Sequence, residues 1–163
     1  MKKLIVLAVV AIATYFVFFQ DSFHKELHLD GQTYSYVKTM RGGEATNHFY
    51  SPDGEPIETA TSFIQIVQLS ENFQDTSKWL DNMNPLFTQY KLTPVGNQPL
   101  EVAGSFEKSG FVLGTYGAPI SVNGTNHMAF YVVATNKEGT GEATTSAQDV
   151  INQLKGLGAD LDK

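Results

Sequence analysis

The segment ISVNGTNHMAFYVVAT, residues 120–135, carries the clearest β-hairpin signal of the chain. Asn123-Gly124 stands at its centre, and Asn-Gly is a favoured two-residue turn because both central positions need a positive φ. The run from Phe130 to Val133 predicts a central strand. Pro119 lacks a backbone N–H and therefore predicts an edge position for the partner strand. This segment indicates an antiparallel sheet.

Asp30-Gly31 predicts a second two-residue turn, between strands at 24–29 and 32–38. Pairing about this turn sets Leu27 opposite Tyr34. These two residues then share an apolar face, and the polar residues of both strands share the other. The expected product is a half-buried ribbon close to the N-terminal segment.

The remaining patterns complete the sheet and add a first helix. Further strands are expected at 45–51, 57–69, 100–107 and 110–116. A helix is expected to begin near Asp75 or Thr76, because its apolar residues from Trp79 to Tyr90 recur at helical spacing. Pro85 predicts a kink or a break within it.

A second helix is expected at the C-terminal end. Thr145 or Ser146 caps it, and Asp149 is placed for a capping box. Gly156 and Gly158 provide stop signals. The predicted fold class is therefore α+β, a mostly antiparallel sheet of about six to eight strands with two helices packed on it.

A short internal similarity raises the possibility of two similar halves, 24–91 and 98–158. Thr46-Asn47-His48 precedes one aromatic strand segment, and Thr125-Asn126-His127 precedes another. The match covers three identical residues, so coincidence is the alternative explanation. A two-fold design would give each half several strands followed by a helix.

Residues 1–20 predict a membrane signal anchor. Lys2 and Lys3 precede a nearly all-apolar run at 4–19, and such a run forms a helix in lipid because its backbone must satisfy its own hydrogen bonds. A cleaved signal peptide is the alternative, with a small-x-small site at Ala11-Ile12-Ala13. We favour the uncleaved anchor, because the apolar run continues well past that site and ends in aromatic residues typical of a membrane interface.

The charges flanking the anchor predict its orientation. Basic residues stay cytoplasmic, so the N-terminus faces the cytoplasm and residues 21–163 form a domain in the periplasm or outside the cell. We expect a single-pass protein of the bacterial inner membrane, with secretion after cleavage as the alternative. The exported part holds 9 basic and 17 acidic residues, a net charge of −8.

Composition excludes several classes of function. The chain of 163 residues has no cysteine, which removes disulfides, thiolate zinc sites and iron–sulfur clusters. Its net charge of −6 argues against binding nucleic acid, which requires basic patches. It has no P-loop, no Gly-x-Gly-x-x-Gly and no Gly-x-Ser-x-Gly motif, so we predict no cofactor.

Histidines supply the candidate ligand-binding site. His48 and His127 each stand near the start of a strand, with Tyr50 and Tyr131 further along the same strands. If the strands are neighbours, the imidazoles face each other and form a polar cluster that can bind a ligand or respond to pH. Two hydrogen-bonded histidines at a strand rim are the plainer interpretation.

Two other groups of residues have side chains that can form sites. His24, Glu26 and His28 would supply three metal ligands only if their ribbon bent, so no metal site is predicted. Trp79, Phe87 and Tyr90 are a candidate partner-binding patch, although such a stripe is more often part of a core.

These observations favour a non-enzymatic role. The expected function is a membrane-tethered envelope accessory or binding protein that engages another envelope protein. A periplasmic carrier of a small molecule or lipid is the first alternative, with aromatic residues lining a cleft. A small hydrolase with His48 or His127 as general base is the second.

Overall fold

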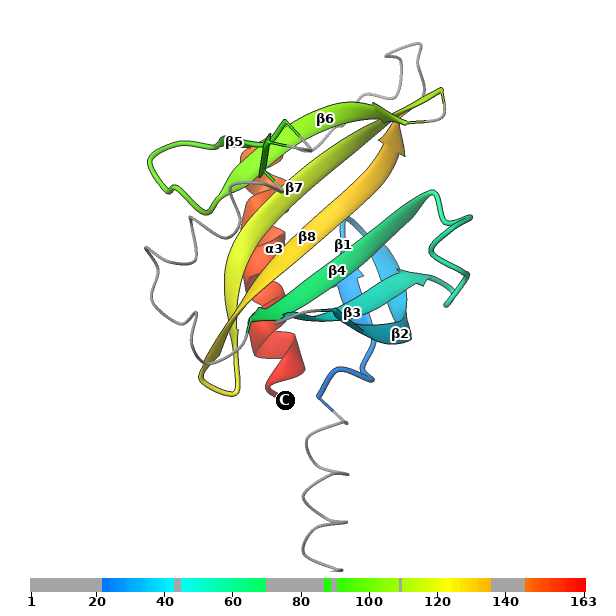
Figure 1. Ribbon diagram of the computed structural model, residues 1–163. Helices are drawn as coiled ribbons and strands as arrows, with labels where there is room; N and C mark the ends of the chain where they lie inside the picture. The colour runs from blue at the N-terminus through cyan, green and yellow to red at the C-terminus, as the bar shows by residue number, and fades with distance from the viewer. Residues whose placement is uncertain (1–21, 43–44, 70–86, 89–90, 109, 136–145) are drawn as a thin grey trace, which may run out of the picture.

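The computed structural model describes residues 22–42, 45–69, 87–88, 91–108, 110–135 and 146–163. These residues form a curled antiparallel sheet of eight strands with one helix against it (Figure 1). The elements are β1 (Leu27–Leu29), β2 (Gln32–Gly42), β3 (Ala45–Pro52), β4 (Ser62–Leu69), β5 (Thr93–Pro94), β6 (Val102–Lys108), β7 (Phe111–Val122), β8 (Thr125–Thr135) and α3 (Ala147–Leu161).

The strand order is β1-β2-β3-β4-β8-β7-β6-β5, with every pair antiparallel. The first four strands form one meander and the last four form another. The two meanders join where β4 pairs with β8. The predicted central strand at 130–133 belongs to β8 and therefore lies beside β4 in the middle of the sheet.

Both predicted two-residue turns are confirmed. Asp30 and Gly31 have φ values of 52° and 74°, and Leu27 pairs with Tyr34. Asn123 and Gly124 have φ values of 50° and 73° between β7 and β8. The positive φ angles are those that a hairpin turn of this kind requires, which explains why short-range sequence located both turns.

The predicted α+β fold class is wrong. The chain is mostly strand, and its sheet curls into a half-barrel around a single C-terminal helix in the part of the chain that the structure describes. The curled sheet encloses α3 on its concave side (Figure 1). The expected helix around Trp79 to Tyr90 lies outside the described residues, except for the helical pair Phe87 and Thr88.

Several strands differ in length from the prediction: β1 and β4 are shorter, and β2 and β7 are longer. The segments 110–116 and 120–122 are one strand, Phe111–Val122, that continues through Gly117 and Pro119. A Cβ at Gly117 would lie 2.8 Å from the Phe130 ring, so this glycine permits close packing and does not end the strand. Among the described strands, β6 pairs with β7 only as far as Gly117, so Pro119 occupies a stretch with β8 alone as partner. The predicted edge position of this strand is wrong, because β7 lies between β8 and β6, although its stretch at Pro119 is paired with β8 alone.

The helix α3 begins as predicted and ends later. Ser146 accepts a hydrogen bond from the Asp149 backbone N–H at 3.2 Å and donates to its carboxylate at 2.7 Å. The helix then passes through Gly156 and Gly158 to Leu161. A Cβ at Gly158 would lie 2.5 Å from the Ser121 carbonyl oxygen, so this glycine lets the helix approach β7 closely.

Apolar residues pack on both faces of the sheet. The concave face and α3 form the larger cluster, in which the helix contributes Val150, Ile151, Leu154, Leu157 and Leu161. Each such side chain stabilises the fold by roughly 1.5–3 kcal/mol when fully buried. The opposite face holds a second cluster that includes Val67, Met128 and Phe130. Phe87 packs into this second cluster and is 8% exposed.

Within the described ranges, none of the helices has the length and apolar character needed to cross a membrane. The predicted anchor, residues 1–20, lies outside them.

Candidate functional site

Strand register places His48 and His127 on the same face of the sheet. His48 of β3 is opposite Ile66 of β4, and His127 of β8 is opposite Gln68 of β4. Ile66 and Gln68 are two apart and point to the same side. The two histidines therefore flank β4 on the concave face, although their own strands are not neighbours.

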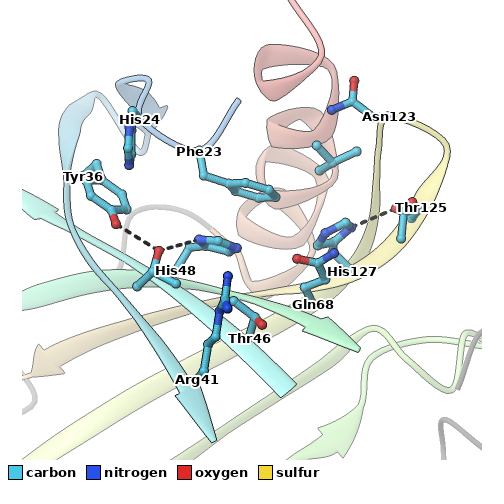
Figure 2. Close-up of a pocket in the computed structure, with 12 residues that line it drawn as sticks. Phe23, His24, Tyr36, Arg41, Thr46, His48, Gln68, Asn123, Thr125 and His127 are labelled. Atoms are coloured by element: carbon cyan, nitrogen blue, oxygen red, sulfur yellow. Dashed lines mark hydrogen bonds between the residues drawn. The ribbon is translucent and has the colours of Figure 1, made fainter. Parts of the chain in front are cut away.

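A cavity of about 380 Å³ lies between these histidines, the turn before β1 and the β7–β8 turn (Figure 2). The lining residues are Phe23, His24, Tyr36, Thr39, Arg41, Thr46, His48, Gln68, Val122, Asn123, Thr125 and His127. Its size is in the range of small-molecule sites, which are commonly about 300–1,000 Å³. We call it the histidine pocket.

The histidine pocket gathers groups that are cationic or can become so. Arg41 is the chain's single arginine, and three of the four histidines line the same space. Among the described lining residues none is Asp or Glu, although the chain carries a net charge of −6. Asp162 lies near enough to act on His127, and its carboxylate accepts the Asn123 backbone N–H at 2.5 Å. The pocket therefore holds the Arg41 cation beside two buried imidazoles, in an acidic protein.

His127 is held by a backbone carbonyl. Its Nδ1 lies 2.8 Å from the carbonyl oxygen of Thr125. Its Nε2 is buried and has no hydrogen-bond partner among the residues that the structure describes. Burial lowers the pKa of His127, although the Thr125 carbonyl and Asp162 act in the opposite direction.

His48 is held by a chain of hydroxyls. Its Nδ1 lies 2.8 Å from Thr39 Oγ1, which in turn lies 2.9 Å from the Tyr36 hydroxyl. Burial, followed by the neighbouring His127, lowers the pKa of His48 to about 4. Smaller effects of His24 and Arg41 also lower this pKa. The side-chain amide of Gln68 raises it.

The Nε2 of His48 is also buried, and within the described ranges no group, Gln68 included, meets the distance and angle of a hydrogen bond to it. We call the Nε2 atoms of His48 and His127 the inner nitrogens. In Figure 2 the hydrogen-bonded nitrogen of each ring points away from the other ring. Leaving a buried polar atom without a partner costs about 1–3 kcal/mol, so each inner nitrogen is a favourable place for a ligand atom.

Phe23 covers the histidines from the segment that precedes β1. Its ring stacks on His48 with centroids 3.8 Å apart and planes 2° from parallel. It also contacts His127, at 5.6 Å and 44°. The Tyr50 hydroxyl donates to the Phe23 carbonyl oxygen at 2.8 Å, and Asn123 Nδ2 donates to Ser22 Oγ at 3.2 Å. These bonds hold the segment across the mouth of the pocket.

The structure separates the predicted ligand residues into two places. Tyr50 and Tyr131 share the concave face with the histidines, but both stand opposite Ile64, one row further along β4. The Tyr131 hydroxyl lies 3.3 Å from that of Tyr34 inside the core. Both tyrosines are buried outside the pocket lining, and burial raises the pKa of each well above its usual value.

Of the remaining candidates in the described part of the chain, His24 lines the pocket and the others do not. His28 is exposed and bonds Thr33, away from the pocket lining. No cluster of three or more possible metal ligands occurs among the described residues. Trp79 and Tyr90 lie outside those residues, and Phe87 is buried in the second apolar cluster.

Sequence reasoning missed Phe23 and Arg41. One signal for Arg41 was available, because it is a single arginine in an acidic chain, three residues after the predicted strand at 32–38. Phe23 gave no such signal, because the two histidines that it covers stand 25 and 104 positions further along the chain.

In comparisons with protein families, curated proteins and solved structures, none matches the chain.

Proposed function

We propose that this chain is a membrane-tethered binding protein whose extracytoplasmic domain holds a small organic anion in the histidine pocket. The observation that carries the proposal is the pair of buried inner nitrogens, which lie under Phe23 beside a cavity lined by the chain's single arginine. Arginine and histidine are the side chains that best match a carboxylate or phosphate.

The membrane tether rests on the sequence of residues 4–19. If that run ends at the membrane surface, the four residues 20–23 span at most about 14 Å. The histidine pocket would then open close to the membrane, with Phe23 at its mouth. We also propose, from the sequence, that the domain engages another envelope protein. That partner would receive the bound molecule or sense its presence.

A hydrolase is less well supported by the same geometry. A general base works best when its pKa is near the operating pH. The pKa of His48 is lowered to about 4 and that of His127 is also lowered. Both are therefore weak bases at neutral pH, and binding explains their burial better than proton abstraction does.

Thermal unfolding of the full-length chain in nonionic detergent tests the proposal. A ligand that binds only the folded state raises Tm. We expect carboxylates such as gluconate, lactate and hexanoate to raise Tm, and their uncharged amides to have no effect.

The charge contribution is tested with two variants of β2. Arg41→Gln removes the pocket cation and should abolish most of the shift. Lys38→Gln removes an equal charge from the same strand, but Lys38 pairs with Glu58 outside the pocket lining, at 2.7 Å. The proposal is wrong if amides stabilise as well as acids, or if Lys38→Gln weakens the shift as much as Arg41→Gln.

A further inference from the structure

Thr125 determines which hydrogen-bonding role His127 offers to the pocket. A carbonyl oxygen only accepts, so Nδ1 of His127, 2.8 Å away, carries the hydrogen. In a neutral imidazole the other nitrogen is then an acceptor. Burial leaves His127 2% exposed and lowers its pKa, so the ring is neutral near pH 7. A ligand atom that meets the inner nitrogen of His127 must therefore bring a hydrogen.

The hydrogen-bonding role of His48 can change, whereas that of His127 is fixed. Its Nδ1 meets the Thr39 hydroxyl, which can donate or accept, and the Tyr36 hydroxyl behind it can do the same. With Tyr36 donating to Thr39 and Thr39 donating to Nδ1, His48 presents an N–H at its inner nitrogen. That N–H can donate to an anion without any change in the charge of the ring.

We propose that the ligand is a small hydroxylated carboxylic acid, an inference that depends on the proposed anion pocket. Its carboxylate lies at Arg41 and His48, and its hydroxyl donates to the inner nitrogen of His127. The two imidazoles flank β4 on one face, so a molecule lying across that strand meets both. Phe23 and Val122 give the pocket apolar wall area for the carbon skeleton.

Phe23 must swing aside for this contact. Both inner nitrogens are buried, and the Phe23 ring stacks on one histidine and touches the other. Its backbone is held by the Tyr50 hydroxyl, so the side chain can rotate while the segment stays in place. The ligand then takes the position over the imidazoles that the phenyl ring occupies.

Isothermal titration calorimetry of the full-length chain in nonionic detergent at pH 7 tests the inference with two six-carbon acids. Gluconate carries hydroxyls and hexanoate carries none. We expect gluconate to bind at least about tenfold more tightly, because a site with a buried acceptor discriminates against an analogue that lacks the donor. His127→Leu should bring the two affinities close together, and His28→Leu, outside the pocket, should leave the preference unchanged.

A second measurement needs no variant. Gluconate binding to the wild type in two buffers of different ionisation enthalpy should show about zero protons taken up, since the hydroxyl supplies the hydrogen at His127. Uptake near one proton means that one of the two imidazoles meets the ligand as an imidazolium, and this overturns the inference.

The outcomes separate this inference from the proposed function. If hexanoate binds as tightly as gluconate, or if folded His127→Leu keeps the preference, the hydroxyl assignment is wrong and the anion pocket stands. If neither acid binds at millimolar concentration and no carboxylate raises Tm, the anion pocket is wrong and the hydroxylated ligand is wrong with it.

Discussion

The buried imidazole of His48 should make the protein sensitive to mild acid. Its pKa is lowered from 6.5 to about 4, chiefly by burial and then by His127, with Gln68 opposing and His24 and Arg41 adding small effects. At pH values between about 4 and 6.5, the unfolded chain therefore binds a proton at His48 that the folded chain does not bind. Stability contributed by neutral His48 is fully present above pH 6.5 and is lost as the pH falls toward 4.

The size of this effect follows from the pKa. Each tenfold difference in proton affinity is worth about 1.4 kcal/mol, so the full loss is about 3 kcal/mol, of which about 2.5 kcal/mol is gone by pH 4.5. Domains of this size are stable by about 5–15 kcal/mol, so the change is a large share of the total. The pKa of His127 is also lowered, which adds a loss in the same direction.

Urea unfolding of the full-length chain at pH 7.5, 6.5, 5.5 and 4.5 measures this loss against a variant that does not titrate. His48→Gln should reduce the fall in free energy of unfolding by about 2–3 kcal/mol between pH 6.5 and 4.5. His28→Gln makes the same change at an exposed site and should follow the wild type. A pH profile of His48→Gln that runs parallel to the wild type would refute the argument that burial keeps His48 neutral.

Two further predictions concern packing and access. Gly158→Ala should cost about 1–3 kcal/mol, because its Cβ would lie 2.5 Å from the Ser121 carbonyl. No described atom approaches a Cβ at Gly156 within 4 Å, so Gly156→Ala in the same helix should stabilise by about 0.5–1 kcal/mol. Equal effects in urea unfolding would contradict the close approach of α3 to β7. Phe23→Ala should speed the association of gluconate in stopped-flow measurements while Arg41 still holds the anion. An unchanged or slower rate would show that Phe23 does not cover the site.

The turns of the fold were predictable because their determinants are local. Asp30-Gly31 and Asn123-Gly124 need positive φ angles at adjacent positions, and few residue pairs permit them. The register at Leu27 and Tyr34 followed from the turn. The curl of the sheet was not predictable in this way, because it arises from the twist of eight paired strands and from the β4–β8 pairing across some 60 residues of chain.

Two glycines led to wrong predictions of where an element ends, because their roles depend on tertiary contacts. At Gly158 the sequence pattern predicts a helix stop, yet the residue lies inside α3 where the helix touches the backbone of Ser121. At Gly117 it permits contact with the Phe130 ring within a continuous strand. Each glycine is far in sequence from the residue that it contacts, and only the folded sheet brings the two together.

The candidate site was partly visible in the sequence. His48 and His127 could be selected because each stands near the start of a strand in the same Thr-Asn-His setting. Their shared face depends on β4, which stands between them, and the pocket depends on Phe23 and Arg41 from elements that only the fold brings near. Whether each inner nitrogen donates or accepts a hydrogen bond likewise depends on Thr125 and Thr39, whose contacts with the imidazoles form only in the folded chain.

Nuclear magnetic resonance of the full-length chain, with 15N-labelled histidine, tests most directly whether the histidine pocket binds an organic anion. Titration with gluconate should shift the imidazole resonances of His48 and His127 in a saturable way and leave that of His28 in place. If all three histidines respond alike, or if only His28 moves, the anion does not occupy the pocket and the account is wrong.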